Sequence, residues 1–397
     1  MPLVRGDGLK QALTDFLMEE SMDAYMIHAG STTDSDLYYL TRFLAHDPLL
    51  YLHTVEKDLV LVSTLEAGRA QKQADVDEIV TTERYNLSER IKRGVPVAEA
   101  YVEVIKELLH DTLNRKSVVK IAVPQNFEVY LADRLREDRE IIPTISPLKA
   151  ARARKRRDEI ALIRDAERNA EQALGLAEET LKQSTVRGSR LYFNDEILTS
   201  EKLRSIIDMN LLSKGYETEA TIVAGGTQSA EPHNIGSGPL EPDKPIVIDI
   251  FPRHKTNRYH ADFTRTFVRG RPDPEVREMH NAVLDAQEKA IETIRPGITG
   301  SEVHETVTRV LEAHGYESGD EGFIHSTGHG VGLDIHEPPS LSESGEPLDS
   351  GNVITIEPGL YYQKIGGVRI EDLVVVTENG CRNLTTYHKE LKIEERR

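Results

Sequence analysis

The chain has 397 residues, of which 49 are Lys or Arg and 67 are Asp or Glu, so its formal net charge at pH 7 is −18. This acidic balance argues against a general affinity for nucleic acid or for anionic membranes, both of which attract basic proteins. Cys381 is the only cysteine, which excludes an intramolecular disulfide and a zinc site built from cysteines. The first residues lack the hydrophobic core of a signal peptide, and no run approaches the roughly 18 apolar residues of a membrane span. We therefore expect a cytoplasmic protein.

The first third of the chain predicts an α/β domain. Apolar residues at helical spacing predict a helix over residues 9–20, and a second helix begins at Pro96. Short apolar runs predict strands at residues 23–28, 49–53, 59–63 and 118–123. No motif in residues 1–148 suggests chemistry, so we interpret this domain as a scaffold, a lid or a dimerisation unit.

A basic segment, KAARARKRRDEI, begins at Lys149 and marks the change to a second domain, residues 149–397. Its six basic residues are isolated in an acidic chain and lead directly into a long helical pattern. We interpret them as a solvated linker rather than a nucleic-acid site.

The second domain mixes helices and strands in an α+β order. The predicted elements are a helical stretch at 194–214, a strand at 221–226, a strand pair within 245–270, and helices at 273–294 and 302–313, followed by strands and loops.

The strand pair within 245–270 is the first place where the sequence suggests a functional site. Two β-branched runs flank the polar segment 254–258, which predicts an antiparallel hairpin with that segment as its turn. Asp249 and Asp262 lie near the open ends of the paired strands, in apolar surroundings. A carboxylate in such a place requires a cation or a strong hydrogen-bond donor. A salt bridge to Arg265 or a neighbouring arginine, or a bound metal, would each satisfy this requirement.

Three later segments supply further potential metal ligands. Glu357 ends an apolar strand before Pro358 and Gly359, and Glu371 lies within an apolar run where an unpaired acid would be costly. His329 lies between two glycines, which predicts that the backbone approaches a ligand closely there. Together with the two aspartates they form a set of four carboxylates and one imidazole. This set suits two divalent cations such as Mn²⁺, Co²⁺, Zn²⁺ or Fe²⁺, which would neutralise its four negative charges.

The segments that carry these residues resemble a known family. They are Asp249 with DFTRT, HSTGHGVGLDIHE, IEPGLYY and GGVRIEDL. In order and spacing they are similar to the pita-bread metallopeptidases (family M24), which include Xaa-Pro dipeptidase (prolidase), Xaa-Pro aminopeptidase and methionine aminopeptidase. The resemblance covers residues 150–397, and the first domain resembles the creatinase-type domain of the proline-directed members. It implies an α/β N-terminal creatinase-type domain followed by an α+β pita-bread catalytic domain.

The resemblance also implies a role for each matching residue. The five metal ligands would be Asp249, Asp262, His329, Glu357 and Glu371, with Asp262 and Glu371 shared by two ions. In such enzymes a hydroxide shared by the metals attacks the scissile carbonyl, and Glu357 would handle the proton. His233 resembles the histidine near the scissile nitrogen, and His336 the one that steadies the tetrahedral intermediate. His325 matches a substrate-pocket histidine, and Arg369 resembles an arginine that holds a substrate carboxylate through a two-pronged contact.

The function implied by the resemblance is removal of an N-terminal residue from Xaa-Pro dipeptides or longer peptides by a homodimer with two Mn²⁺, Co²⁺ or Zn²⁺ ions. One feature departs from the family. Asp262 follows Asp249 by 13 residues, two more than usual, and Phe251 replaces a glycine. Two added residues keep the alternation of a strand pair, so both acids still face the metals, and the change bears on substrate preference instead.

Other functions fit the sequence less well. Methionine aminopeptidases do not usually carry a separate N-terminal domain of this size. Non-catalytic peptide-binding relatives and creatinase work without the metal set, whereas all five ligands and three pocket histidines are present here. A serine hydrolase of the Gly-x-Ser-x-Gly type is excluded because the chain has no such segment.

Overall fold

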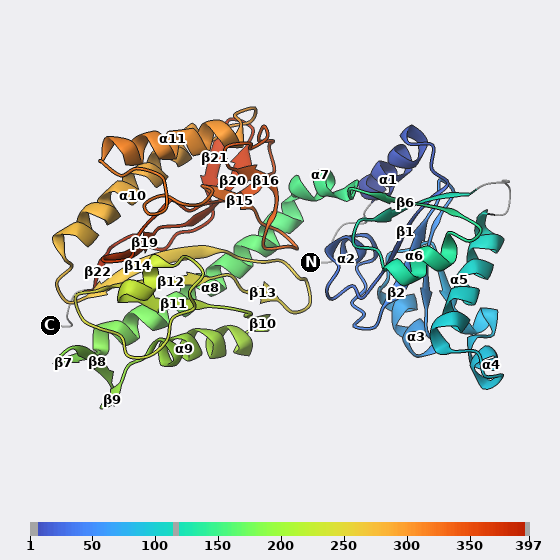
Figure 1. The fold of residues 1–397 in the computed structure, drawn as a ribbon, viewed down its shortest axis with the longest axis horizontal. Coiled ribbons are helices and arrows are strands. Elements are labelled where there is room, and N and C mark those ends of the chain that lie inside the picture. Colours follow the sequence, from blue (N-terminus) through green and yellow to red (C-terminus); the bar gives the residue numbers. More distant parts are fainter. Residues whose placement is uncertain (1–6, 114–118, 394–397) are drawn as a thin grey trace. The chain divides into compact units, whose positions relative to one another are not determined.

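The computed structural model describes residues 7–113 and 119–393, which form two compact units (Figure 1). The N-terminal unit extends to Ala151 and the C-terminal unit begins at Arg152, three residues after the boundary expected from the sequence. Val118, which was expected to begin a strand, lies outside the described residues.

The N-terminal unit is built around a six-stranded mixed sheet with the order β4-β3-β2-β1-β5-β6. Strands β1, β2 and β3 pair antiparallel, whereas β4, β5 and β6 pair parallel to their neighbours. Its elements are α1 (Asp7–Glu19), β1 (Ala24–Ala29), α2 (Ser35–Thr41), β2 (Leu49–His53), β3 (Asp58–Val62), α3 (Thr64–Gln73), β4 (Glu78–Thr81), η1 (Thr82–Tyr85), α4 (Leu87–Lys92), α5 (Val97–Leu113), β5 (Lys120–Pro124), α6 (Val129–Leu135) and β6 (Glu140–Thr144). The helices and strands predicted here are confirmed, with ends that shift by one or two residues. One hydrophobic cluster joins α5 and α6 to the sheet.

The C-terminal unit contains two principal sheets. One has the order β11-β12-β14-β22 and the other the order β16-β15-β17-β20-β21. Helix α7 (Leu148–Ala153) contains the boundary between the units. The elements of the C-terminal unit are α8 (Arg157–Gln183), β7 (Thr185–Arg187), β8 (Arg190–Phe193), β9 (Glu196–Ile197), α9 (Ser200–Ser213), β10 (Tyr216–Glu217), β11 (Ile222–Gly225), η2 (Gly226–Ala230), β12 (Pro245–Ile250), β13 (Arg253–His254), β14 (Phe263–Arg269), α10 (Pro274–Thr293), α11 (Gly300–Ala313), β15 (Gly328–Gly330), β16 (Glu337–Leu341), β17 (Val353–Ile356), β18 (Gly359–Tyr362), β19 (Gly366–Arg369), β20 (Asp372–Thr377), β21 (Gly380–Asn383) and β22 (Lys392–Ile393).

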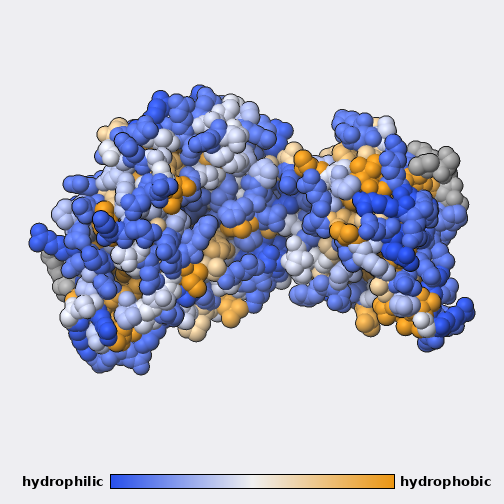
Figure 2. Space-filling model, in the orientation of Figure 1, coloured by the Kyte–Doolittle hydropathy of each residue, from blue (hydrophilic) through white to orange (hydrophobic). Residues whose placement is uncertain are grey.

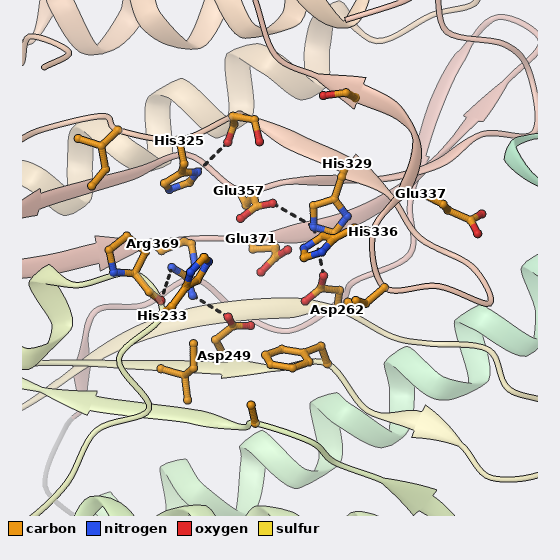
Figure 3. A pocket seen from close by; sticks show the side chains of 18 of the residues that line it. His233, Asp249, Asp262, His325, His329, His336, Glu337, Glu357, Arg369 and Glu371 are labelled. Atoms are coloured by element: carbon orange, nitrogen blue, oxygen red, sulfur yellow. Dashed lines mark hydrogen bonds and ion pairs between the residues drawn. The ribbon is translucent and has the colours of Figure 1, made fainter. Parts of the chain in front are cut away.

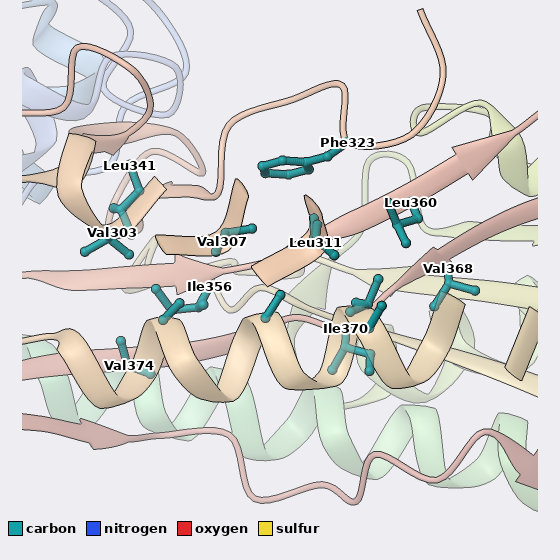
Figure 4. Close-up of a cluster of buried hydrophobic side chains, with 14 of the residues drawn as sticks. Val303, Val307, Leu311, Phe323, Leu341, Ile356, Leu360, Val368, Ile370 and Val374 are labelled. Carbon is teal, nitrogen blue, oxygen red and sulfur yellow. The ribbon is translucent and has the colours of Figure 1, made fainter. Parts of the chain in front are cut away.

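Each of the two principal sheets is covered by its own pair of helices. Helices α8 and α9 pack on the first sheet, and α10 and α11 pack on the second, so the strands lie between the helix pairs (Figure 1). The two hydrophobic clusters that result contain mainly Leu, Ile, Val and Ala, and Figure 4 shows the one around α10 and α11. This layering fixes the strands whose ends carry the predicted ligands.

The predicted hairpin is confirmed as an antiparallel pair, β12 with β14, in which Asp249 lies opposite Thr264. The connection is more than a turn, because β13 within it pairs with β10. The helix predicted over 194–214 begins only at Ser200, so this prediction was wrong for its first six residues. Asn194 and Asp195 have φ values of 53° and 62° and form the tip of the β8–β9 hairpin.

The interpretation of the basic segment as a solvated linker was wrong for two of its residues. Arg152 and Lys155 are only 7% and 6% exposed. Both pair with the buried carboxylate of Glu337, Arg152 at 2.7 Å through Nη2, and Arg152 also pairs with Asp334. Helical periodicity gave no sign of this, because the partner lies more than 180 residues away along the chain.

The surface agrees with the polar composition of the chain. On the face shown in Figure 2, hydrophilic residues cover most of the C-terminal unit and hydrophobic residues form scattered patches. Among residues 7–113 and 119–393, none of the helices combines the length and the hydrophobicity that crossing a membrane requires.

The buried ion pairs at Glu337 predict a stability effect. In Glu337→Leu the buried ammonium of Lys155 loses its carboxylate, which we expect to lower the free energy of unfolding by roughly 3–5 kcal/mol. The double variant Lys155→Met/Glu337→Leu should recover part of this loss. Urea denaturation of the metal-free protein measures both. Arg154→Ala is the matched control, since Arg154 is exposed, and we expect it to change stability by less than about 1 kcal/mol. Equal effects of Glu337→Leu and Arg154→Ala would contradict the prediction.

Candidate metal centre

Every site residue predicted from the sequence lines one cavity of the C-terminal unit. The cavity has a volume of about 960 Å³, and its polar lining comes from both sheets (Figure 3). The lining includes all nine predicted residues: His233, Asp249, Asp262, His325, His329, His336, Glu357, Arg369 and Glu371. Segments separated by well over one hundred residues in the chain thus meet at one place.

The strand pair β12–β14 positions the two aspartates. Asp249 lies on β12 opposite Thr264, and Asp262 precedes β14, two residues before Thr264. Because side chains alternate along a strand, Asp262 and Thr264 lie on one face, and Asp249 shares that face as the cross-strand partner of Thr264. The extra residues between the aspartates therefore leave both acids directed into the cavity.

The second sheet contributes the other three predicted ligands. Glu357 directly follows β17 and Glu371 directly precedes β20, and the pairing of Ile356 with Asp372 brings these two positions together. His329 is the middle residue of β15, and its Nε2 lies 3.3 Å from Glu357 Oε1 and 3.6 Å from Asp262 Oδ2. Asp262, His329 and Glu371 each place one potential ligand atom within 4.8 Å of the corresponding atoms of the other two.

The glycines beside His329 have a different structural reason from the expected one. A Cβ at Gly328 would lie 2.0 Å from the carbonyl oxygen of Thr355, and a Cβ at Gly330 would lie 2.3 Å from that of Pro338. Only glycine permits this approach, so these positions let β15 pack closely against its neighbouring strands. The close packing nevertheless fixes the backbone that carries His329.

Three of the four carboxylates each accept a hydrogen bond from a neighbouring side chain through one of their two oxygens. Arg369 Nη2 donates to Asp249 Oδ2 at 2.6 Å, and Thr264 Oγ1 donates to Glu371 Oε2 at 2.7 Å. Thr355 Oγ1 donates to Glu357 Oε1 at 3.1 Å. The other oxygen of Asp249, Oδ1, is buried and has no hydrogen-bond partner in the described structure. A buried carboxylate oxygen without a partner, among further carboxylates, is an environment suited to a cation.

His329 is oriented as a metal ligand would be. Its Nδ1 lies 3.1 Å from the carbonyl oxygen of Gly330, which only accepts hydrogen bonds, so Nδ1 carries the proton. The lone pair of Nε2 then faces the carboxylates. Burial, with a smaller contribution from His336, lowers the pKa of His329 to about 3. The ring is therefore neutral at physiological pH.

The acids of this cavity repel one another. Burial raises the pKa of both Asp262 and Glu371 well above the usual range, and the neighbouring carboxylates raise it further. Burial also raises the pKa of Glu357 to about 7, although the guanidinium of Arg369 opposes the rise. Divalent cations would relieve this repulsion, so the donor set fits a metal centre.

A salt bridge to Arg265, the alternative explanation for the two aspartates, is not what the structure shows. Arg265 is buried and pairs with Asp372 at 2.8 Å, on the opposite face of β14 from Thr264. The neighbouring arginine that does pair with Asp249 is Arg369, and it occupies only one of the two oxygens.

The three further histidines line the same cavity. The ring of His336 meets that of His329 edge to face, with centroids 4.2 Å apart. His325 is held from both sides, because Nδ1 donates to the carbonyl of Ser326 at 2.7 Å and Nε2 accepts from the Tyr361 hydroxyl at 2.9 Å. Burial lowers the pKa of His325 to about 4, and burial also lowers the pKa of His336 below its usual range. His233 reaches the cavity from the loop after η2.

Arg369 is already surrounded by partners. Besides Asp249, it donates through Nη1 to the Tyr361 hydroxyl at 2.9 Å and through Nε to Thr264 Oγ1 at 3.1 Å. A two-pronged contact with a substrate carboxylate would require some of these bonds to be exchanged. The expected role of Arg369 thus stays a prediction.

Several site residues were not found from the sequence. Thr264, Thr355 and Tyr361 donate hydrogen bonds to the predicted residues. Glu337 also lines the cavity, as does Phe251, which the sequence had already marked as a departure from the family. Thr264 and Tyr361 lie inside the motifs DFTRT and IEPGLYY, but their residue types are ordinary in strands and gave no separate signal.

Comparison with known proteins identifies the family. Residues 161–378 match metallopeptidase family M24, and residues 10–154 match the creatinase/prolidase N-terminal domain. The chain belongs to metallopeptidase family M24. It is therefore a metallopeptidase, and membership of the family implies divalent metal ions as cofactor.

Relatives and solved structures agree with this assignment. A Xaa-Pro dipeptidase from Pyrococcus furiosus is 38% identical over 293 residues, which cover 73% of this chain and 77% of the relative. The prolidase from Pyrococcus horikoshii OT3 superposes with a TM-score of 0.80 at 27% identity, covering 97% of this chain and all of that one. The X-Pro aminopeptidase from Thermotoga maritima MSB8 gives a TM-score of 0.77 at 28% identity, covering 96% and 99%. The expected creatinase-type and pita-bread domains are confirmed.

The raised pKa values predict how stability depends on pH when metal is absent. An acid with a higher pKa in the folded chain binds protons preferentially when folded, so its contribution to stability is lost as the pH rises through that pKa. We expect the free energy of unfolding of the metal-free protein to fall between about pH 6.5 and about pH 8. Urea denaturation in the presence of a chelator measures it.

Two comparisons isolate the cause of that pH dependence. Below about pH 6.5 the lowered pKa values of His325 and His329 act in the opposite direction, so only the upper window is diagnostic. Glu357→Gln should flatten the profile in that window, and saturating Mn²⁺ should abolish it. A metal-free protein whose stability rises between pH 6.5 and pH 8 would contradict the electrostatic description of the site.

Proposed function

We propose that this metallopeptidase hydrolyses the bond between an N-terminal residue and proline, in Xaa-Pro dipeptides or in longer peptides, with two divalent ions held by Asp249, Asp262, His329, Glu357 and Glu371. The observation that carries the proposal is the meeting of four carboxylates and a neutral imidazole in one cavity. Relatives named Xaa-Pro dipeptidase, prolidase and X-Pro aminopeptidase support the choice of substrate.

We assign the metals to this site because its donors fit them. When bound, divalent ions supply Lewis acidity and lower the pKa of water. Two M²⁺ ions would match the four carboxylates in charge, and Mn²⁺, Co²⁺ and Zn²⁺ all accept carboxylate and imidazole ligands. The hydrogen bonds that Thr264, Thr355 and Arg369 donate to the carboxylates would fix the orientation of these acids as ligands.

The side chains around the metals would handle protons and charge. Glu357, whose pKa is raised to about 7 in the metal-free site, is suited to accept a proton and return it to the leaving nitrogen. His336, beside His329, would donate a hydrogen bond to the oxyanion, and His233 would lie near the scissile nitrogen. These roles remain proposals for each of the three residues.

The substrate class agrees with the type of binding that this cavity offers. A bond before proline is a tertiary amide without an N–H, so an enzyme that binds substrate as an added strand loses a hydrogen bond there. Recognition through side chains from the cavity wall does not need that N–H. The apolar residues Ile222, Phe251 and Ile335 of the same wall offer contact to a proline ring.

A second hollow bears on peptide length. It has a volume of about 1260 Å³ and shares Ile324, His325, Ser326 and Ser344 with the cavity of the metal centre. A peptide longer than two residues could extend into it. This observation favours aminopeptidase activity as the second candidate, beside the dipeptidase activity that the relatives' names favour.

Peptide hydrolysis tests the proposal directly. We expect the metal-free protein to cleave neither Ala-Pro nor Ala-Pro-Ala. Adding Mn²⁺, Co²⁺ or Zn²⁺ should restore cleavage of Ala-Pro, and also of Ala-Pro-Ala if the second hollow accepts the longer peptide. The products can be followed by chromatography. Ala-Ala serves as the matched substrate without proline. Cleavage of neither proline peptide by protein shown to hold two metals would contradict the proposed substrate, and equal cleavage of Ala-Ala would contradict the proline preference.

Substitutions separate the ligands from the other cavity residues. Asp262→Asn and Glu371→Gln should reduce bound Mn²⁺ and abolish hydrolysis with the fold retained, since each removes a carboxylate at the centre of the cluster. His336→Ala should lower kcat by about 100-fold or more and keep both metals. Metal analysis and circular dichroism accompany the kinetics. Full activity in Asp262→Asn, or loss of metal in His336→Ala, would overturn the respective assignment.

Cytoplasmic location and assembly as a homodimer remain expectations within this proposal, as does the absence of nucleic-acid and membrane partners. Sedimentation at several protein concentrations tests the dimer.

A further inference from the structure

A buried amide outside the cavity links the two glutamates of the metal centre. Gln287 lies on α10, is fully buried, and is surrounded by the hydrophobic cluster of α10, α11 and the second sheet. Its Nε2 donates to the carbonyl oxygen of Ile356 at 3.1 Å and to that of Ile370 at 3.3 Å. Figure 4 shows Ile356 and Ile370 within this cluster.

The orientation of this amide is decided by its acceptors. Backbone carbonyls only accept hydrogen bonds, so the NH₂ group and not Oε1 must face them. Oε1 is buried and has no hydrogen-bond partner in the part of the chain that the structure describes. A buried acceptor without a partner is costly, and its presence in a hydrophobic cluster requires an explanation.

The two carbonyls are distinguished by their neighbours in the chain. Ile356 is joined by its peptide bond to Glu357, and Ile370 to Glu371. One NH₂ group thus holds the two peptide planes from which two of the predicted ligands begin. Because both bonds start at a single nitrogen, they limit how far the planes can separate.

The sheet alone does not provide this restraint. The ladder between β17 and β20 ends at the pair Ile356 and Asp372, and β19 ends at Arg369. Glu357 and Glu371 therefore lie just beyond the regular pairing of these strands. Their backbone amides donate elsewhere, that of Glu357 to the carbonyl of Thr327 at 2.8 Å and that of Glu371 to the carbonyl of Thr264 at 3.1 Å, so neither bond joins the two glutamate segments to each other. A metal site requires its ligands to be held to within about 0.5 Å of one another, and the amide of Gln287 adds a direct link between these two segments.

We propose that Gln287 is a positioning residue of the metal centre, whose amide sets the spacing of Glu357 and Glu371 from the helix side of the sheet. The proposal rests on the assignment of these glutamates as ligands. Gln287 does not line the cavity described above, so it acts through the two backbone segments and not on substrate.

Metal affinity measured without substrate tests the proposal. Gln287→Met keeps the length of the side chain and removes both hydrogen bonds, and we expect it to weaken Mn²⁺ binding by roughly 10- to 100-fold. Gln287→Glu places oxygens against both carbonyls and should weaken binding at least as much. Isothermal titration of the full-length chain with Mn²⁺ alone is the readout, and urea denaturation reports the stability of each variant.

The matched control is Val283→Ala, one turn earlier on α10 and equally buried. It loosens the same hydrophobic cluster and leaves the amide in place, so we expect wild-type affinity for Mn²⁺. Wild-type affinity in Gln287→Met, or the same loss in Gln287→Met and Val283→Ala, would overturn the proposal. Failure of Gln287→Met and Gln287→Glu to fold would also overturn it, because Gln287 would then serve the fold as a whole.

This result is separable from the test of the proposed function. If the wild-type protein binds Mn²⁺ and cleaves no Xaa-Pro peptide, the proposed substrate is wrong. The Mn²⁺ affinities of the Gln287 variants then still decide whether Gln287 is a positioning residue. If Asp262→Asn and Glu371→Gln bind Mn²⁺ as wild type does, the ligand assignment fails and the role of Gln287 fails with it.

Discussion

The repulsion among four carboxylates that line one cavity is the constraint on which this structure depends. Asp249, Asp262, Glu357 and Glu371 line one cavity, and burial together with their mutual repulsion raises the pKa of the last three. Such a group is unfavourable in a protein that lacks cations. It persists because each acid lies on or beside a strand whose neighbouring residues are packed in the hydrophobic clusters of the unit.

Much of the fold and the ligand set could be predicted from local sequence patterns. Alternation predicted the β12–β14 pair and the shared face of its two aspartates. The spacing of apolar residues predicted α5, and the residues that stop a helix predicted where α10 and α11 end. The ligands could be found because an acid in an apolar run has few explanations. The family resemblance supplied their roles, which no pattern in the chain determines.

Most side chains that the sequence misplaced or missed share one physical cause. Their partners lie far away in the sequence, so the local pattern of residues does not indicate the contact. Lys155 and Arg152 look like solvated residues in a basic run until Glu337 lies against them. Thr264, Tyr361 and Gln287 are ordinary residues of a strand or a helix until the fold places an acceptor beside each. Only the beginning of α9 was misjudged for a local reason, the left-handed turn at Asn194 and Asp195.

The contacts of the first sheet with Glu371 and with the separate β18–β19 pair bear on how metal binding and folding are related. Thr264 of β14 receives a hydrogen bond from the backbone of Glu371 and donates one to its side chain, while Thr266 exchanges hydrogen bonds with the backbone of Arg369. Arg369 in turn reaches back to Asp249 on β12.

The residues that join the sheets are thus the predicted ligands and their immediate partners. A cation bound by Asp249 and Asp262 on one side and by Glu357 and Glu371 on the other would add a further link along the same line. Binding to the folded state alone stabilises that state, so metal and sheet packing should support each other.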